Sequence, residues 1–390
     1  MSPTAAPPRA ARWAVTATFA ANGGLMGTWF ARIPQVKASF GLSAAVLGLV
    51  LLAPAVGSLV SMPLAGAAAS RLGSARSTQV ALAAFCLVPG LIGLAGGTIS
   101  LALALLMWGA CIGGLDVTMN AQGVTVEKAY QRPILSSFHA AWSIGALGGA
   151  VVGSLLLRRE VALGWQSLLG GVALLVLVGP LTRAFLPDPG TADVTPPLFA
   201  RPHGRLLLIG AAAFAGLLTE GAASDWSGVY LRESLHTPAA AAGLGYAAFA
   251  AAMTVGRLAG DRITARLGRV RTVRFLAGVG AVGLAAGLLI GRPWSAICGF
   301  GLLGLGLATV VPIVFAAAGD DEAAAAPAIA AVSTCGYVGF LAGPTVIGAV
   351  AQLTSLPLAL AMLPVLTASL CLTAAALRPQ RPAAAPLRAG

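Results

Sequence analysis

Charged side chains are scarce in this chain of 390 residues, and their scarcity argues against most classes of protein. Only 9% of the residues are Asp, Glu, Lys or Arg, whereas 58% are hydrophobic. A soluble domain carries about 25% charged residues, so we do not expect a water-soluble enzyme. Disorder is not expected either, because a disordered chain has many charges and little hydrophobicity. The composition predicts a protein with several membrane spans.

The chain also lacks the residue clusters that metal, redox or hydrolytic chemistry requires. Its five cysteines are far apart in apolar stretches, which suggests neither a disulfide framework nor a metal motif. No Walker sequence for ATP is present, and no nucleophile with a base is recognisable. The net charge is +12, but the basic residues fall between apolar blocks instead of forming one basic face. We therefore expect no enzyme activity, no cofactor, no metal and no nucleic-acid partner.

Long apolar runs are what the sequence does contain. A helix needs about 20 mostly apolar residues to cross the roughly 30 Å hydrocarbon core of a bilayer. The runs are continuous, which predicts helices and not the alternating strands of a barrel. The first run is interpreted as a span and not as a cleavable leader, because no small-residue cleavage site follows it. The predicted spans are residues 12–31, 44–69, 77–97, 101–126, 134–157, 161–186, 206–231, 238–258, 272–291, 294–318, 327–351 and 357–377.

Lys and Arg are unequally distributed between the predicted loops. With the N-terminus inside, 18 of the 24 fall on the inner side, Arg257 among them, and this bias predicts that both termini are cytoplasmic. The Pro-rich segment 187–205 is a predicted cytoplasmic linker between a first half, residues 1–186, and a second half, residues 206–377. Residues 378–390 form a predicted disordered cytoplasmic tail.

The two halves also repeat each other. A shift of 195 residues aligns residues 19–76 with 214–271 without a gap, and places Arg71-Leu72-Gly73 on Arg266-Leu267-Gly268. Because each half has six spans, both halves enter the membrane in the same direction. The predicted fold is an all-α membrane protein with twelve transmembrane helices in two pseudo-symmetric six-helix bundles, an arrangement used by rocking transporters.

The loop after the second span of each half carries glycine and charge. Glycine near a helix end allows close backbone approach. Aspartate and arginine can form a charge relay at the cytoplasmic mouth that is made or broken as the halves tilt. The alternative is that these arginines only follow the positive-inside rule. The candidate gating residues are Gly66, Arg71, Gly73, Arg76, Asp261, Arg262, Arg266, Gly268 and Arg269.

Twelve spans in two halves, with this loop in both, resemble the major facilitator superfamily. Within it, Arg32-Ile-Pro34 and segments 116–123, 138–145 and 336–344 are similar to a poorly characterised bacterial inner-membrane branch, distantly similar to fucose-permease-like sugar porters. The resemblance implies a multi-pass secondary transporter in a bacterial inner membrane. The chain departs from the superfamily pattern at Ser70, where the first-half loop usually has Asp.

Four ionisable residues lie within predicted spans: Asp116, His139, Glu220 and Asp225. A charge at the bilayer centre costs about 2.5–3.5 kcal/mol, so such residues face the bundle interior and are functional by default. Asp116 and His139 are predicted at similar depth on successive helices, so they can pair and carry a coupling proton. The alternative is a structural hydrogen-bond network. Glu220 and Asp225 are five residues apart, about 140° around a helix, so they are not expected to point the same way.

No Lys or Arg lies near the middle of any predicted span, and this absence favours a neutral polar or cationic solute. We expect proton-coupled uptake of a small neutral polar solute, such as a sugar or polyol. The energy is expected to come from a proton or cation gradient across the lipid bilayer, and the transporter is expected to be a monomer. The alternative is a proton-driven exporter of cationic or lipophilic compounds. Asp320, Asp321 and Glu322 are predicted to form a solvated loop. The candidate residues of the substrate and proton pathway are Asp116, Asn120, His139, Trp142, Glu220, Asp225, Tyr337, Asn22 and Gln122.

Overall fold

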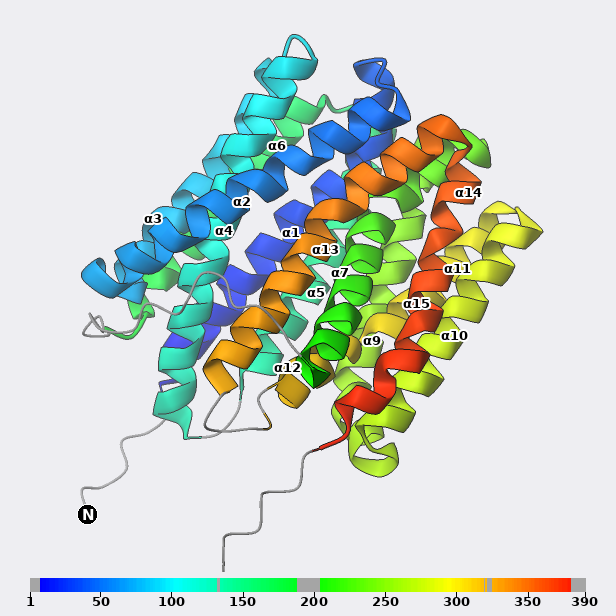
Figure 1. Cartoon of the computed structure of the whole chain (residues 1–390). Coiled ribbons are helices and arrows are strands. Elements are labelled where there is room, and N and C mark those ends of the chain that lie inside the picture. The colour runs from blue at the N-terminus through cyan, green and yellow to red at the C-terminus, as the bar shows by residue number, and fades with distance from the viewer. Residues whose placement is uncertain (1–7, 132–133, 188–203, 319, 321–324, 380–390) are drawn as a thin grey trace, which may run out of the picture.

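The computed structural model describes residues 8–131, 134–187, 204–318, 320 and 325–379, and this part of the chain is helical (Figure 1). The first half contains α1 (Arg9–Ser39), α2 (Ala44–Leu72), α3 (Ser74–Leu87) continued by η1 (Val88–Leu94), α4 (Thr98–Tyr130), α5 (Leu135–Arg158), and α6 (Leu163–Val178) continued by η2 (Gly179–Ala184). The second half contains α7 (Arg205–Val229) continued by η3 (Tyr230–Ser234), α8 (Ala239–Ala242), α9 (Leu244–Leu267), α10 (Arg269–Ile290), α11 (Pro293–Leu307), α12 (Val310–Ala318), α13 (Ala325–Leu353), α14 (Leu356–Leu360), α15 (Met362–Thr373) and η4 (Ala374–Leu377).

Each predicted span corresponds to one helix or to two or three helices in direct succession, which confirms the fold class. Eleven helical stretches in the described part are long and apolar enough to cross a membrane. The predicted span outside this set is α1, whose sequence is interrupted by Thr, Asn and Gly residues. These polar residues are tolerated because α1 packs inside the bundle, where Phe19 and Ile33 are fully buried. Residues 188–203 of the predicted linker and 380–390 of the predicted tail lie outside the described residues.

The internal repeat is visible in the helix boundaries. α1 ends at Ser39 and η3 ends at Ser234; α2 begins at Ala44 and α8 begins at Ala239. Each pair is separated by the same shift of 195 residues that aligned the two halves of the sequence. The repeat therefore extends from matching residues to matching places where the chain turns.

The turn after the second span of each half has the same backbone in both halves. Gly73 ends α2 with φ of 82°, and Gly268 ends α9 with φ of 75°. Residues with a side chain rarely adopt this left-handed region, and glycine does so at little cost. The paired glycines of the candidate gating loops are thus explained by backbone conformation.

Glycines also bring α1 and α5 into backbone contact inside the first half. A Cβ atom on Gly145 would collide with the carbonyl oxygen of Ala20, and one on Gly149 would collide with that of Gly24. Glycines at this spacing let two helices approach closely in a membrane, where van der Waals packing takes the place of the hydrophobic effect. The line along which α1 and α5 meet, which we call the α1–α5 seam, is therefore formed by backbone contacts at these glycines.

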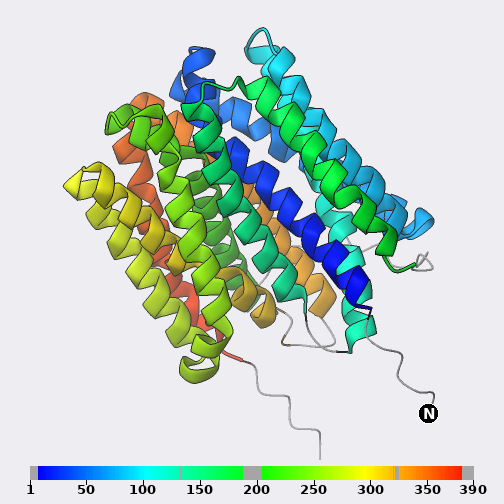
Figure 2. The ribbon, with the colours of Figure 1, turned by 180° about the vertical axis from the view of Figure 1, so that it is seen from behind.

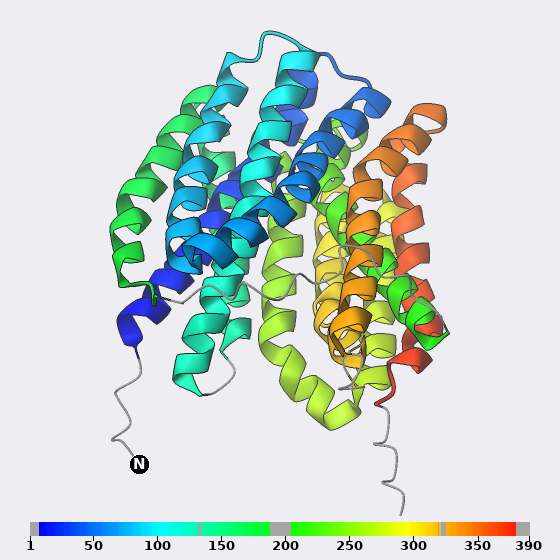
Figure 3. The ribbon, with the colours of Figure 1, turned by 60° about the vertical axis from the view of Figure 1, so that its left-hand side comes forward.

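The two halves lie side by side, and α1 begins at the same end of the bundle at which η4 ends (Figure 3). We call this end the terminus side. The halves meet at the opposite side, where α2 packs on α13 and α5 packs on α8 and α9. The view from behind shows α5 and α9 next to each other (Figure 2). There Lys37, near the end of α1, forms an ion pair of 2.6 Å with Glu233 of η3. The structure is therefore closed at the opposite side.

Candidate functional site

A cavity of about 370 Å³ lies between the two halves. Its wall comes from α1, α2, α4 and α5 of the first half and from α7, α9 and α13 of the second. Seven of the nine residues predicted for the substrate and proton pathway line this one space: Asn22, Asp116, His139, Trp142, Glu220, Asp225 and Tyr337. These seven side chains come from five helices and converge on a site that the sequence could only indicate one helix at a time.

Asp116 on α4 is held by Asn120, one turn further along the same helix. The Asn120 Nδ2 atom donates to the Asp116 carboxylate at 3.2 Å and to its backbone oxygen at 2.8 Å. The predicted Asp116–His139 pair is not formed: neither a hydrogen bond nor an ion pair joins these two described residues. The His139 ring instead packs edge-on against Phe19, with 5.2 Å between the ring centroids. Both groups still face the same cavity.

Trp142 on α5 is tied to Asn22 on α1. Its indole Nε1 donates to Asn22 Oδ1 at 2.7 Å. This contact depends on the close approach of the two helices, because a Cβ atom on the adjacent Gly23 would collide with the backbone oxygen of Trp142. An aromatic face and an amide are therefore fixed together on the first-half wall of the cavity.

Gln122, also predicted for the pathway, lies outside the cavity wall. It is fully buried, donates to the Leu186 backbone oxygen at 2.8 Å and accepts a bond of 3.4 Å from Ser74 Oγ. These contacts join α4 to the start of α3 and to the end of the sixth span. The structure gives Gln122 a packing role instead.

Arg257 on α9 is the residue of the site that sequence reasoning missed. It lines the cavity, pairs with Glu220 of α7 at 3.3 Å, and donates to Ser143 Oγ of α5 at 3.0 Å. The expectation that no arginine lies at membrane depth is therefore wrong. The predicted span ended at residue 258, whereas α9 continues to Leu267. Arg257 is thus ten residues inside the helix, or about 15 Å.

Glu220 and Asp225 both line the cavity, although they are five residues apart on α7. They were not expected to point the same way, yet both reach the one cavity, as their place in the predicted pathway requires. Glu220 is directed to Arg257, whereas Asp225 is 9% exposed and has no hydrogen bond or ion pair to a described residue. An unpaired Glu220 in a membrane span was the available signal that a cation such as Arg257 would face it.

The candidate gating residues have different surroundings. Gly73 and Gly268 occupy the left-handed turns, but no atom lies within 4 Å of a Cβ placed on Gly66, so close approach is not its role. The side chain of Asp261 is outside what the structure describes. The exposed arginines of this group are Arg71, Arg76, Arg262 and Arg266.

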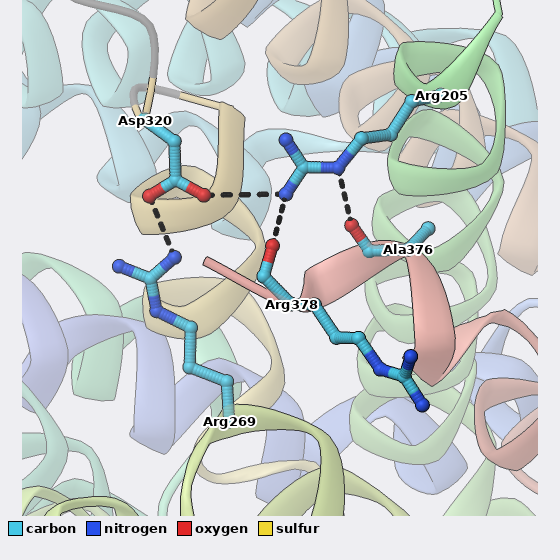
Figure 4. Close-up of polar contacts among 5 residues, drawn as sticks. All are labelled: Arg205, Arg269, Asp320, Ala376 and Arg378. Carbon is cyan, nitrogen blue, oxygen red and sulfur yellow. Dashed lines mark hydrogen bonds and ion pairs between the residues drawn. The ribbon is translucent and has the colours of Figure 1, made fainter. Parts of the chain in front are cut away.

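The charge relay on the terminus side is built around Asp320, which lies between α12 and α13 (Figure 4). Its carboxylate accepts from Arg269 at 2.7 Å and from Arg205 at 3.2 Å, and its side chain is only 11% exposed. Arg205 also donates to the backbone oxygens of Ala376 at 2.7 Å and Arg378 at 2.6 Å. The prediction of a solvated loop is wrong for Asp320. The relay joins the ends of several helices within the second half.

Comparison with known proteins agrees with this architecture. The family model described as Major Facilitator Superfamily matches residues 14–325. An uncharacterized MFS-type transporter of Yersinia pestis is 40% identical over 338 residues, covering 86% of this chain and 87% of that protein.

Two solved structures share the fold at low sequence identity. The D323A mutant of the nucleoside transporter NupG has a TM-score of 0.73 at 13% identity, covering 94% of this chain and 99% of that one. The human organic anion transporter MFSD10 has a TM-score of 0.65 at 14% identity, covering 95% of this chain and 100% of that one. The matched family and the twelve-span fold together lead to one conclusion: this chain belongs to the Major Facilitator Superfamily of secondary transporters.

Proposed function

We propose that this protein takes up a small polar solute of sugar or polyol size by alternating access, and that the uptake is coupled to protons. The observation that carries the proposal is the cavity of about 370 Å³ between the halves, with carboxylates and aromatic side chains from both of them. Rocking of the halves exposes such a site first to one side of the membrane and then to the other. With both termini in the cytoplasm, the structure is the state closed to the outside.

The chemistry of the wall supports a polar cargo with a flat or ring-shaped body. The Trp142–Asn22 pair presents an aromatic face beside an amide, and Trp29 and Trp108 add two more indole rings to the wall. Aromatic faces stack on rings, and amides hydrogen-bond hydroxyl groups. The structural neighbour named as a nucleoside transporter supports the inclusion of nucleosides among the solutes to be tested.

In this mechanism Asp116 carries the coupling proton. Its carboxylate faces the cavity within a membrane span, where an uncompensated charge is costly. Protonation of Asp116 removes that charge and permits the rocking step while solute is bound.

The Asp116→Asn variant should lose proton-driven uptake in reconstituted vesicles, because asparagine keeps the shape of the side chain but cannot ionise. The measurement is uptake of a labelled solute after an imposed pH step. Glu160→Gln, an acid-to-amide change at an exposed loop position, is the matched control and should leave uptake unchanged. Proton-driven uptake at the wild-type rate by Asp116→Asn would show that Asp116 does not have this role.

Export of cationic compounds is the second candidate function, and Asp225 is the observation that favours it. Its buried carboxylate faces the cavity without a described partner, and a cationic cargo would supply one. Resistance of overexpressing cells to cationic drugs, lost in Asp225→Asn, would favour export over uptake.

A further inference from the structure

We infer that Arg257 is the group that binds the cargo, and that the cargo carries an acidic group, a carboxylate or a phosphate. This inference rests on the proposed function and narrows its solute class. It is drawn from the contacts of Arg257, from its place between the halves and from the charges around it.

Arg257 is only partly satisfied by its protein partners. A guanidinium has five N–H donors in a planar fork that suits two parallel bonds to one carboxylate. Here one nitrogen reaches Glu220 at 3.3 Å and another reaches Ser143 at 3.0 Å. The two arginine contacts of Asp320 are 2.7 Å from Arg269 and 3.2 Å from Arg205, so the Glu220 contact is the longest of the three. The Glu220 contact is therefore long and uses one carboxylate oxygen. The guanidinium can still form a shorter contact with two parallel hydrogen bonds to another acidic group.

Arg257 lies between the two halves, where a bound cargo would contact both of them. It is the one Lys or Arg among the described residues that line the cavity. It belongs to α9 of the second half, and its bond to Ser143 reaches α5 of the first half. An anion that enters a membrane protein loses its hydration and needs such a cation in compensation. A cargo acid bound at Arg257 would therefore sit between the two moving halves.

Glu220 gives the binding step its dependence on protons. When a cargo anion takes the place of Glu220 at Arg257, two anionic groups would face one guanidinium. Glu220 relieves this repulsion by taking one proton from water, while the cargo acid stays ionised. Glu220 lines this cavity and also a small adjoining pocket, which Tyr246 lines as well. The titratable or charged groups in the two walls besides Glu220 are Arg257, Tyr246, His139, Asp116, Tyr337 and Asp225. Arg257 is the one of them in an ion pair with Glu220.

The test compares acidic solutes with neutral solutes of the same shape on the purified full chain. Binding is measured for glucose against glucuronate, for mannitol against mannonate and for adenosine against adenosine monophosphate. In the wild type we expect the acidic member to bind, its affinity to rise as the pH falls, and one proton to be taken up at Glu220. Carboxylate and phosphate sources are distinguished by which acidic members bind.

Four variants locate the effect. Arg257→Gln should weaken binding of the acid about 10- to 100-fold, the range for losing hydrogen bonds to a charged group. Arg257→Lys should restore part of the affinity, because it keeps the charge but not the fork. Glu220→Gln should bind the acid at least as tightly as the wild type and without the pH dependence. The control, Arg292→Gln, changes an exposed arginine in the turn before α11 and should have no effect.

The double variant Arg257→Gln/Glu220→Gln removes both partners of the ion pair, so neither is left as an unpaired charge, and it separates loss of binding from loss of folding. Acid binding by this folded double variant at wild-type affinity would overturn the inference. Binding of the neutral members alone would also overturn it, while the proposed uptake of a polar solute would stand. Binding of neither series would contradict the proposed function itself.

Discussion

Replacing Gly48 by leucine should abolish transport while the protein stays folded. Gly48 on α2 faces α13 of the other half, where a Cβ atom would lie 2.7 Å from the backbone oxygen of Pro344. Gly348 on α13 faces back, with a Cβ position 2.6 Å from the Ala44 oxygen. A leucine side chain would hold the halves apart at the opposite side, so the cycle could not pass through the state described here.

The expected measurement is solute uptake in vesicles, with thermal unfolding as the check on folding. Gly48 contacts the other half and not the core of its own half, so the melting temperature should change little. Val46→Leu, two residues earlier on an exposed surface, is the matched control and should transport normally. Normal uptake by Gly48→Leu would show that the halves need not close at this point.

Replacing Gly149 by leucine should prevent folding altogether. Gly149 packs on the backbone of α1 at Gly24, and the same is true of Gly145 one turn away at Ala20. Overpacking usually costs about 1–3 kcal/mol, and the cost is higher when backbone and not a flexible side chain must move. Since α1 also carries Asn22, separation of α1 from α5 would disrupt the cavity wall as well.

The neighbouring Gly148 provides the control for this prediction. No atom lies within 4 Å of a Cβ atom placed on Gly148, although it is adjacent to Gly149 in the sequence. Gly148→Leu should therefore yield as much monodisperse protein as the wild type, and Gly149→Leu should yield almost none. Equal yields of both variants would contradict the account of the α1–α5 seam.

The fold was predictable because its signals are local and repeat along the chain. A long apolar run is sufficient to predict a span, and a shift of 195 residues was sufficient to predict two matching halves down to the turns at Gly73 and Gly268. The set of cavity residues was predictable for a related reason. Polar residues such as Asp116 and Glu220 are stable within a membrane span only where they face the interior.

The pairing of those residues was not predictable, because it depends on distances between helices. Asp116 binds Asn120 of its own helix and not His139 of the next one. Arg257 was assigned to the cytoplasmic end of its span because the apolar run ends one residue later, although the helix does not. Asp320 was assigned to solvent because its two arginine partners, Arg205 and Arg269, are distant in the sequence. Each error concerns a contact that only the packed bundle creates.

The central claim is that the two halves separate and close at the opposite side during each transport cycle. The most direct test is a disulfide between cysteines placed at Ala31 of α1 and at Gly243, just before α9, because a Cβ atom on Gly243 would lie 3.3 Å from that of Ala31 across the halves. The variant would be made after the five native cysteines are replaced. Oxidation should stop solute uptake in vesicles and reduction should restore it. Uptake at an unchanged rate by the fully cross-linked protein would contradict the claim.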